Sequence, residues 1–439
     1  MNGSSIRLPY GSSSLAFDHP PGWRVEHAVS TPPPAARIEP LLRDALFSPV
    51  AGPRLRDLVR PGMRITIVVP DATRACPTPE LLDGLWNELG PAGVREADMT
   101  LLIGLGVHRG LDASEIAKLL RDWATCCPVE QAFASEASSY VDLGIVPVEI
   151  TGLQEEIPVR LHHRVLACDL LLSIGLVEPH QLAGYSGGRK TVAIGCASAE
   201  TIARLHGPDM LEHSGTRLGV LDGNPLHAAL EWIAERAGLR FVINVAESGD
   251  GAIAGVACGP PRDVLQALVR EVERYEISKV APGPYDVVFA GVPVPKDANL
   301  YQATRAQTYI AFPRVPLVRE DGWIVSAASC GEGAGLGPGE KEFLQLMQAG
   351  SNALEVLAHV RTERYAAGGQ RALLLAKALT HHRLMMVGMR DPDLARRCHM
   401  VGARDANDAM QVLVPALGSD ARVLVVPNAL AVLPVPEVS

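Results

Sequence analysis

Long apolar runs are missing from this sequence. None of its 439 residues belongs to an uninterrupted apolar stretch of the roughly 18 residues that a membrane-spanning helix needs. The first residues, MNGSSIRLPYGSSS, also lack the apolar core of a secretory signal. We therefore predict a cytoplasmic protein and no membrane partner.

Basic residues are in short supply. The chain has 40 Lys and Arg against 49 Asp and Glu, a net charge of −9. Phosphate backbones are bound by basic faces, so we expect no nucleic-acid partner. The eight cysteines form no CxxC pair and are scattered through apolar segments, which supports neither a disulfide framework nor a cysteine zinc site.

What the sequence does contain is an alternation of short apolar runs and helical patterns. Strands are predicted over Arg64–Pro70, Met99–Gly106, Asp169–Gly175 and Leu239–Ala246. Helical spacing is found over 77–89 and 112–124, the latter with a predicted capping box of Asp112 and Glu115. Continuous apolar strands separated by helices predict an α/β fold, in which helices cover both faces of a mostly parallel sheet.

A second alternating set follows a helix predicted over 261–276. Its strand-like runs cover 286–294, 322–331, 382–389 and 421–429. Between the two sets, Ser278–Asp286 carries two prolines and a glycine and is the best candidate for a linker. We predict two α/β domains, residues 1–280 and 281–439, each with a mostly parallel sheet flanked by helices, and an active site in the cleft between them.

Polar residues follow the predicted strands of the first domain. Asp71 and Arg74 follow the first strand, His108 the second and His180 the third. Ligands of open α/β sheets bind at the carboxyl edge. Three separate segments therefore bring chemically active side chains to one rim.

Two glycine-rich stretches resemble nucleotide motifs without matching them. Gly104–Gly110 has Arg109 where a dinucleotide fingerprint needs glycine, and Gly184–Thr191 has Arg189 where a phosphate loop needs glycine before the lysine. The glycines of the second stretch still allow backbone amides to approach an anion.

One histidine is placed differently from a surface residue. His206 lies in the last turn of a helix predicted to be capped by Ser198, just before Gly207. A neutral imidazole there could bind a metal, but a single histidine makes a poor metal site, so other ligands must come from outside the protein.

The sequence resembles the nickel-dependent lactate racemase family, whose members use a nickel-pincer nucleotide. The matching segments run in order along most of the chain: Asp71–Pro77, Gly106–Gly110, Glu178–Ile202 with His206, Asn299–Ala306 and Ser329–Gly335. The block PHQLAGYSGGRK with a histidine sixteen residues after its lysine is highly specific, whereas the other segments are weak alone.

The resemblance implies a covalent cofactor. Lys190 would hold the pyridinium nucleotide through a thioamide, His206 would complete the nickel coordination, and Ser186, Gly187 and Gly188 would contact the cofactor. Enzymes of cofactor synthesis are then required for maturation.

The same resemblance, together with chemistry, implies a reaction. Inverting C2 of a 2-hydroxy acid is achieved by removing hydride to a cofactor and returning it on either face of the keto acid. Each face needs a group for the hydroxyl proton, and imidazole suits this task near neutral pH. His108 and His180 match the family's histidine pair, and Arg74 matches an arginine that orients the substrate, with Asp71 beside it.

The second half of the chain carries further matching residues. Tyr301 and Gln302 match cofactor and substrate contacts. Arg305 stands where the lactate enzyme has lysine, and residues 361–382 lack the tryptophan expected in its pocket. A planar fork replaces a point charge, so a small 2-hydroxy acid is expected as substrate but lactate itself is not fixed.

Three other interpretations stay open. The same cofactor could serve an epimerase of a larger 2-hydroxy acid or sugar acid. The chain could be an NAD-dependent 2-hydroxy acid dehydrogenase, or a nucleotide- or metal-binding module without turnover.

Overall fold

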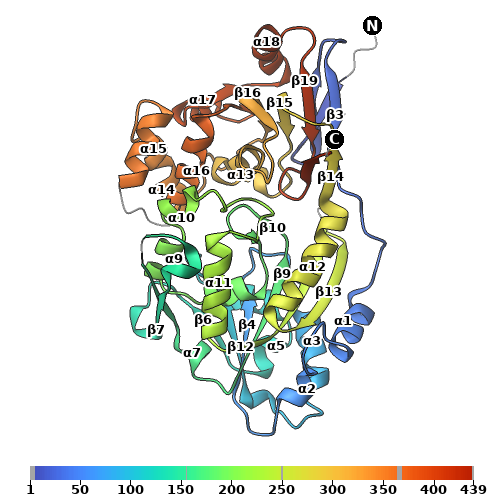
Figure 1. Ribbon diagram of the computed structural model, residues 1–439, viewed down its shortest axis with the longest axis vertical. Coiled ribbons are helices and arrows are strands. Elements are labelled where there is room, and N and C mark those ends of the chain that lie inside the picture. Colours follow the sequence, from blue (N-terminus) through green and yellow to red (C-terminus); the bar gives the residue numbers. More distant parts are fainter. Residues whose placement is uncertain (1–4, 155, 249–250, 363–367, 438–439) are drawn as a thin grey trace. The chain divides into compact units, whose positions relative to one another are not determined.

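The chain folds into two compact units (Figure 1). The computed structural model describes residues 5–154, 156–248, 251–362 and 368–437. The larger unit comprises residues 32–216 and 220–275, and the smaller unit comprises 1–31, 217–219 and 276–439.

The larger unit is built on a six-stranded sheet. The strand order is β13-β12-β9-β4-β5-β6, with β13 antiparallel to β12 and the other neighbours parallel. The bounds are β4 (Ile65–Pro70), β5 (Met99–Gly104), β6 (Val129–Ala132), β9 (Leu170–Val177), β12 (Leu239–Glu247) and β13 (Ile253–Gly259). All four strands predicted for this region are confirmed.

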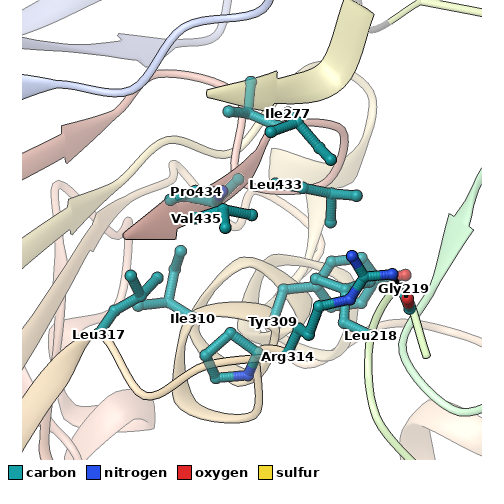
Figure 2. Close-up of a pocket in the computed structure, with 13 residues that line it drawn as sticks. Leu218, Gly219, Ile277, Tyr309, Ile310, Arg314, Leu317, Leu433, Pro434 and Val435 are labelled. Carbon is teal, nitrogen blue, oxygen red and sulfur yellow. Dashed lines mark hydrogen bonds between the residues drawn. The ribbon is translucent and has the colours of Figure 1, made fainter. Parts of the chain in front are cut away.

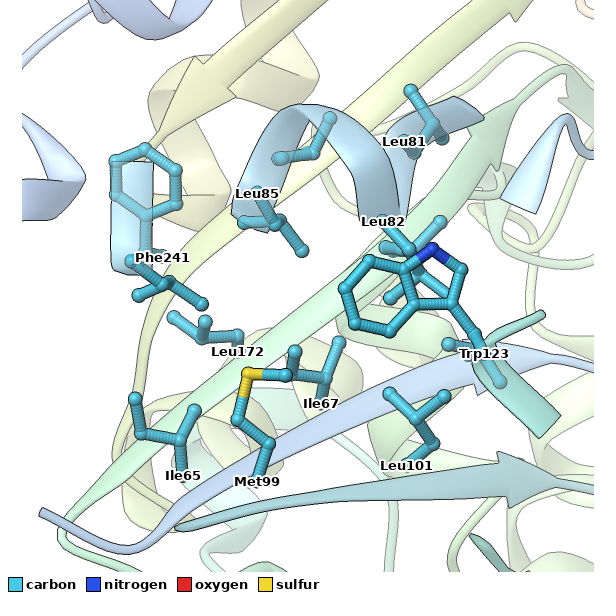
Figure 3. Packing of buried hydrophobic residues seen from close by; sticks show 14 of the residues in the cluster. Ile65, Ile67, Leu81, Leu82, Leu85, Met99, Leu101, Trp123, Leu172 and Phe241 are labelled. Carbon is cyan, nitrogen blue, oxygen red and sulfur yellow. The ribbon is translucent and has the colours of Figure 1, made fainter. Parts of the chain in front are cut away.

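Burial on both faces explains why these strands are continuously apolar. Every residue of β4 and of β9 is buried. On one face, side chains such as Ile67, Leu101 and Leu172 pack against Leu82 of α3 (Thr78–Leu89) and Trp123 of α5 (Trp123–Cys126), as Figure 3 shows. This cluster is the main core of the larger unit.

The helix predicted over 112–124 is divided in the structure. α4 (Ala113–Leu120) ends at Arg121, whose φ of 51° breaks the helix before α5. Its predicted capping box is confirmed, since the Glu115 amide donates to Asp112 at 2.9 Å and the Asp112 amide to Glu115 at 3.0 Å.

The opposite face of the sheet is covered by α8 (Gly188–Ala193). A Cβ atom on Gly175 of β9 would lie 2.3 Å from the Gly188 nitrogen, so the close approach of helix and strand requires glycine. Ser173 of β9 also donates a hydrogen bond to the Gly188 carbonyl at 3.0 Å. The GG pair of the sequence block therefore fixes α8 on the sheet.

The smaller unit contains a second six-stranded sheet, in which all neighbours are parallel. Its order is β18-β17-β16-β15-β19-β3. The bounds are β3 (Arg24–His27), β15 (Tyr285–Ala290), β16 (Val318–Ala327), β17 (Arg383–Val387), β18 (Val401–Ala403) and β19 (Arg422–Val426). Its core gathers Phe289, Trp323 and Met385 with Phe17 of the hairpin β1 (Ser5–Tyr10)–β2 (Ser13–Asp18).

Two segments differ from the prediction. Residues 1–31, predicted to belong to the first domain, are part of the smaller unit, because β3 pairs with β19 and the hairpin packs on that core. The predicted linker Ser278–Asp286 is partly a strand, since β14 (Ile277–Val280) pairs with β20 (Leu433–Pro436).

Helices flank both sheets. Those of the larger unit also include α1 (Ile38–Phe47), α9 (Ala199–Leu205), α11 (Pro225–Arg236) and α12 (Pro261–Glu276). Those of the smaller unit include α13 (Leu300–Ala311), α14 (Pro338–Met347), α15 (Ala353–Thr362), α16 (Gly369–Leu379), α17 (Pro392–Arg397) and α18 (Ala406–Leu417). Among the residues described, none of the helices is both long enough and apolar enough to cross a membrane.

One pocket of the smaller unit is lined mainly by apolar side chains (Figure 2). Its lining includes Ile277, Tyr309, Ile310 and Leu433. Arg314 closes one side by donating to the Gly219 carbonyl at 2.5 Å. None of the site residues predicted from the sequence lines this pocket.

Candidate active site

The carboxyl ends of adjacent strands carry the predicted polar residues of the larger unit. Asp71 directly follows β4, and His108 lies beyond the end of β5. His180 lies in β10 (Pro179–His180), the short strand that follows β9. Parallel strands end at a common edge, so the topology places all three at one rim of the sheet.

Asp71 and His108 form a hydrogen-bonded pair. His108 Nδ1 lies 2.5 Å from Asp71 Oδ2, and Thr73 donates to Asp71 Oδ1 through its hydroxyl at 2.6 Å and its amide at 3.1 Å. Burial raises the pKa of Asp71, but the hydrogen bonds from His108 and Thr73 outweigh it and lower the pKa overall. The ionised carboxylate therefore accepts a hydrogen bond from the Nδ1–H group, which leaves the lone pair of His108 on Nε2.

The exposure of the pair suits proton transfer. The Asp71 side chain is 6% exposed, whereas that of His108 is 53% exposed. A buried carboxylate thus orients an imidazole whose far edge a ligand can reach.

Arg74 is ion-paired with Glu178. Its Nη1 donates to Glu178 Oε1, and its backbone amide donates to the Asp71 carbonyl at 3.2 Å. Glu178 is fixed in turn by Ser186, whose hydroxyl accepts from the Glu178 amide at 3.0 Å and donates to the Leu176 carbonyl at 2.6 Å. Ser186, predicted as a cofactor contact, therefore ties its loop to the end of β9.

His180 has the opposite tautomer from His108. Its Nδ1 accepts from the amides of Leu182 and Ala183, at 3.2 and 3.1 Å. Backbone N–H groups can only donate, so Nδ1 carries the lone pair and Nε2 carries the proton.

A carboxyl group that was not predicted lies at the same edge. Glu247 is the last residue of β12, beside Glu178. Burial raises the pKa of Glu247 to about 7, and the negative charge of Glu178 adds to this effect.

Lys190 lies in the first turns of α8, after the glycine pair. Gly187 has a φ of 131°, a conformation that favours glycine, and the Lys190 amide donates to its carbonyl at 2.9 Å. The Gly188 amide donates to Asn244 Oδ1 at 3.0 Å. That amide is thus bonded within the protein, and the structure gives Gly188 a packing function.

Arg189, next to the predicted tether, is a buried cation. Its guanidinium donates to the carbonyl of Ser186 at 3.1 Å and of Tyr185 at 3.3 Å, and its Nη2 lies 2.9 Å from His227 Nδ1. Burial lowers the pKa of Arg189 to about 10. This side chain braces the loop that leads to Lys190.

His206 follows α9 as its C-terminal cap. The helix begins after Ser198, which accepts a hydrogen bond from the Thr201 amide at 3.3 Å, as predicted. His206 Nδ1 lies 2.8 Å from the Ile202 carbonyl, which makes Nδ1 the donor and Nε2 the nitrogen that could bind a metal. Burial lowers the pKa of His206 to about 4, and the positive charge of Lys190 acts in the same direction. The imidazole is therefore neutral at physiological pH and close to Lys190.

The predicted residues of the smaller unit gather along α13. Asn299 caps this helix by accepting from the Gln302 amide at 3.0 Å. Arg305 Nη2 donates to the Tyr309 hydroxyl at 3.1 Å, and the Arg371 guanidinium lies 5.7 Å from the centre of the Tyr301 ring. Gln302 Oε1 is buried and has no hydrogen-bond partner among the described residues, so it can accept from a ligand.

Two family models match the chain. The lactate racemase N-terminal domain matches residues 10–219, and the lactate racemase C-terminal domain matches residues 284–434. The chain belongs to the lactate racemase family.

Relatives of the lactate racemase family match this chain along almost its whole length. A lactate racemase from Thermoanaerobacterium thermosaccharolyticum is 26% identical over 98% of this chain and 99% of its own. The lactate racemase of Lactiplantibacillus plantarum is 28% identical over 89% of each chain.

Solved structures show the same fold. The lactate racemase apoprotein from T. thermosaccharolyticum superposes with a TM-score of 0.83, at 25% identity, over 98% of this chain and 100% of its own. A protein from Thermotoga maritima, 17% identical, superposes with a TM-score of 0.67 over 91% and 98% of the two chains, which supports the fold alone.

The residues near Lys190 could hold a metal ion only together with a bound group that supplies further ligands. Among the described residues, no group of three His, Cys, Asp or Glu side chains could hold a metal ion. A neutral imidazole close to an amine is nevertheless present in His206 and Lys190. Such a pair suits a metal whose other donors arrive on a bound group.

Sequence reasoning missed three residues of this site. Glu178 begins the matching segment Glu178–Ile202, but the sequence assigns it no role. Glu247 ends a correctly predicted strand. Arg189 stands out in the sequence only because it departs from the phosphate-loop motif. These residues could have been recognised as site candidates because each is a charged residue within or at the end of an otherwise buried apolar segment.

Proposed function

We propose that this chain is a racemase that inverts C2 of a 2-hydroxy acid, lactate or another short-chain acid, with a covalently bound nickel-pincer nucleotide. The observation that carries the proposal is the Asp71–His108 pair at the carboxyl edge of the sheet, with His180 on the next segment of the same rim. The names of the curated relatives support the reaction class.

Lys190 and His206 are the residues that would hold the cofactor. Lys190 would form the thioamide and His206 Nε2 would bind nickel, while Ser186, Gly187, Gly188, Tyr301 and Gln302 are the proposed contacts. When bound, this cofactor supplies the acceptor for the C2 hydrogen as hydride and returns it.

His108 would take the hydroxyl proton of one enantiomer. His108 Nδ1–H donates to Asp71, so the lone pair on Nε2 is the base, and the carboxylate stabilises the imidazolium that forms. Removing this proton from the hydroxyl is what allows the C2–O bond to become a carbonyl as hydride leaves.

His180 would face the oxygen of the other enantiomer. Its Nε2 carries the proton because Nδ1 accepts two backbone amides, so it presents a donor where His108 presents an acceptor. The two histidines thus differ in proton position, as a reaction that removes a proton on one side and supplies one on the other requires.

Arginines would orient the acid. Arg74 would release Glu178 and form an ion pair with the substrate carboxylate instead. Arg305 would bind the substrate together with Gln302. Guanidinium groups bind carboxylates in two parallel hydrogen bonds, which holds the acid in one orientation while hydride leaves C2.

A second candidate keeps the cofactor and changes the acid. The planar guanidinium of Arg305 donates a hydrogen bond to the Tyr309 hydroxyl. An epimerase of a larger 2-hydroxy acid or sugar acid would use the same proton and hydride chemistry. The NAD-dependent dehydrogenase and the binding module without turnover gain no support from the family, whose curated relatives are named for racemisation. A cytoplasmic location and maturation by cofactor-synthesis enzymes stay predictions.

The test is to produce the protein together with the cofactor-synthesis enzymes and to measure its intact mass and nickel content. The loaded protein is then incubated with single enantiomers of lactate and of larger 2-hydroxy acids, and product chirality is followed. A mass adduct, bound nickel and inversion of at least one acid are expected. Loaded protein that inverts none of the acids would disprove the proposal.

A further inference from the structure

Two glutamates lie next to each other where neighbouring strands of the larger unit end. β9 and β12 are parallel and in register, with Val177 opposite Ala246. The next residue of each segment is a glutamate, Glu178 and Glu247. Neighbouring strands are about 4.8 Å apart, so the backbones of the two glutamates are adjacent at one edge of the sheet.

One member of this carboxyl pair is ion-paired with an arginine. Arg74 binds Glu178, and the Glu178 backbone is clamped by Ser186, whose amide donates to the Glu178 carbonyl at 3.0 Å. Glu178 therefore cannot easily move away from Glu247.

Among the described residues, the charged group that acts on Glu247 is the negative Glu178. The charges of Glu247 and Glu80 act on Cys76, and burial raises the pKa of the Cys76 thiol to about 12, so this thiol stays neutral. Asp71, after β4, is already bonded to His108.

Two neighbouring carboxyl groups cannot both ionise without an energetic cost. Like charges raise the pKa of one member of such a pair, and desolvation acts in the same direction. Burial, and after it the Glu178 charge, raise the pKa of Glu247 to about 7, so Glu247 is partly protonated in neutral solution.

We propose that Glu247 is a positioning residue that acts through Glu178 on Arg74. While Glu247 is protonated, Arg74 can exchange Glu178 for the carboxylate of the substrate. Once Glu247 ionises, the second negative charge holds Arg74 and repels the substrate anion. The inference rests on the proposed function, because it takes Arg74 as the arginine that orients the acid.

The carboxyl pair can be tested without turnover. Protein carrying carbon-13 at the glutamate side-chain carboxyl is titrated by NMR between pH 4 and 9. A glutamate that titrates near neutral pH is expected in the wild type and in the exposed control Glu149→Gln. It should be absent in Glu247→Gln, and its midpoint should fall in Glu178→Gln. A midpoint unchanged by Glu178→Gln would overturn the pairing.

The effect on Arg74 is tested with the cofactor-loaded enzyme. Lactate is the first probe, followed by other 2-hydroxy acids. KM for the acid should rise about five- to tenfold between pH 6 and 8.5 in the wild type and in Glu149→Gln, the size that one added charge at short range allows. In Glu247→Gln it should stay low and nearly flat, with kcat close to wild type.

The outcomes separate the two claims. A KM rise that persists in Glu247→Gln would overturn the inference and leave the racemase standing. Absence of turnover on every acid overturns the proposed function, and the NMR titration still decides whether the charge of Glu178 raises the pKa of Glu247. Loss of the KM rise only in Glu247→Gln, with a normal folded spectrum, supports the inference.

Discussion

His108 Nδ1 and Asp71 Oδ2 are 2.5 Å apart, although the residues are separated by 36 others in the chain. The contact exists because β4 and β5 are parallel neighbours and both chains leave the sheet at the same edge. The Asp71 carboxylate, whose pKa is lowered, therefore accepts a hydrogen bond from one particular nitrogen of the imidazole.

Replacing Asp71 with asparagine should leave the fold intact and weaken the base. The amide can still occupy the space and bond Thr73, but it carries no charge to stabilise a protonated His108. A hydrogen bond to a charged group is worth about 1.5–3 kcal/mol, which corresponds to a fall in kcat of roughly 10–100-fold. Racemisation rates and nickel content of the loaded variant check this. An unchanged kcat would mean that Asp71 only holds the loop.

Lys190→Ala should abolish both the cofactor mass adduct and the activity. The amine is the only group of the side chain that could form a thioamide, and α8 should persist because alanine favours helices. Intact-mass measurement after cofactor loading is the readout. Lys118→Ala, on the surface of α4, is the control and should load normally. A Lys190→Ala protein that keeps the adduct would refute the tether.

His206→Ala should lose nickel while the protein stays folded. His206 is half-buried and lies at the end of α9, so its removal should cost less stability than the loss of a fully buried core side chain. Metal analysis of loaded protein gives the result, with the exposed His381→Ala as control. Nickel content equal to that of the control would exclude His206 as the ligand.

The sheet could be predicted from the sequence, but the pairing across long distances could not. β4 and β9 are buried on both faces, so their composition alone marks them as strands. β3 has four residues of mixed exposure, and only its pairing with β19, nearly 400 residues later, makes it a strand. Short edge strands of this kind are defined by their partner rather than by their own residues.

The candidate site could likewise be predicted only in part from the sequence. Polar residues after parallel strands had to meet at one edge, which is how Asp71 and His108 could be placed together from the sequence. The relation of Glu178 to Glu247 depends on the register of β9 and β12, which no local pattern reveals. The hydrogen bonds that fix the tautomers of His108 and His180 likewise exist only in the folded chain.

Glu247→Gln should change how stability depends on pH. The pKa of Glu247 is raised to about 7 in the folded protein, so between pH 4.5 and 7 the folded state binds more protons than the unfolded state. Stability from this group is therefore full below its unfolded pKa and is lost as pH rises toward 7. Urea unfolding at pH 5 and 8 should show a smaller loss in Glu247→Gln than in the wild type. Equal losses would show that Glu247 is not protonated in the folded state.

His108 and His180 should each be needed in both directions. A positioned proton transfer is worth about 10²–10⁴-fold, so His108→Ala or His180→Ala should lower the rate by at least that order from either enantiomer. Both directions suffer because the group that accepts a proton from one enantiomer donates it when that enantiomer is formed. A purely structural histidine would instead lower stability, with activity falling only in proportion to the folded fraction.

Deuterium at C2 of the acid decides the other half of the reaction. If hydride leaves and returns within the closed site, the inverted product keeps the label. Loss of the label to water at every turnover would mean that C2 is deprotonated by a side chain, and the role proposed for the cofactor would be wrong. The histidine variants sharpen this test, because the Asp71–His108 pair handles only the hydroxyl proton. Slow variants should therefore still retain the label in whatever product they form, and a variant that exchanged it would show that His108 also reaches C2.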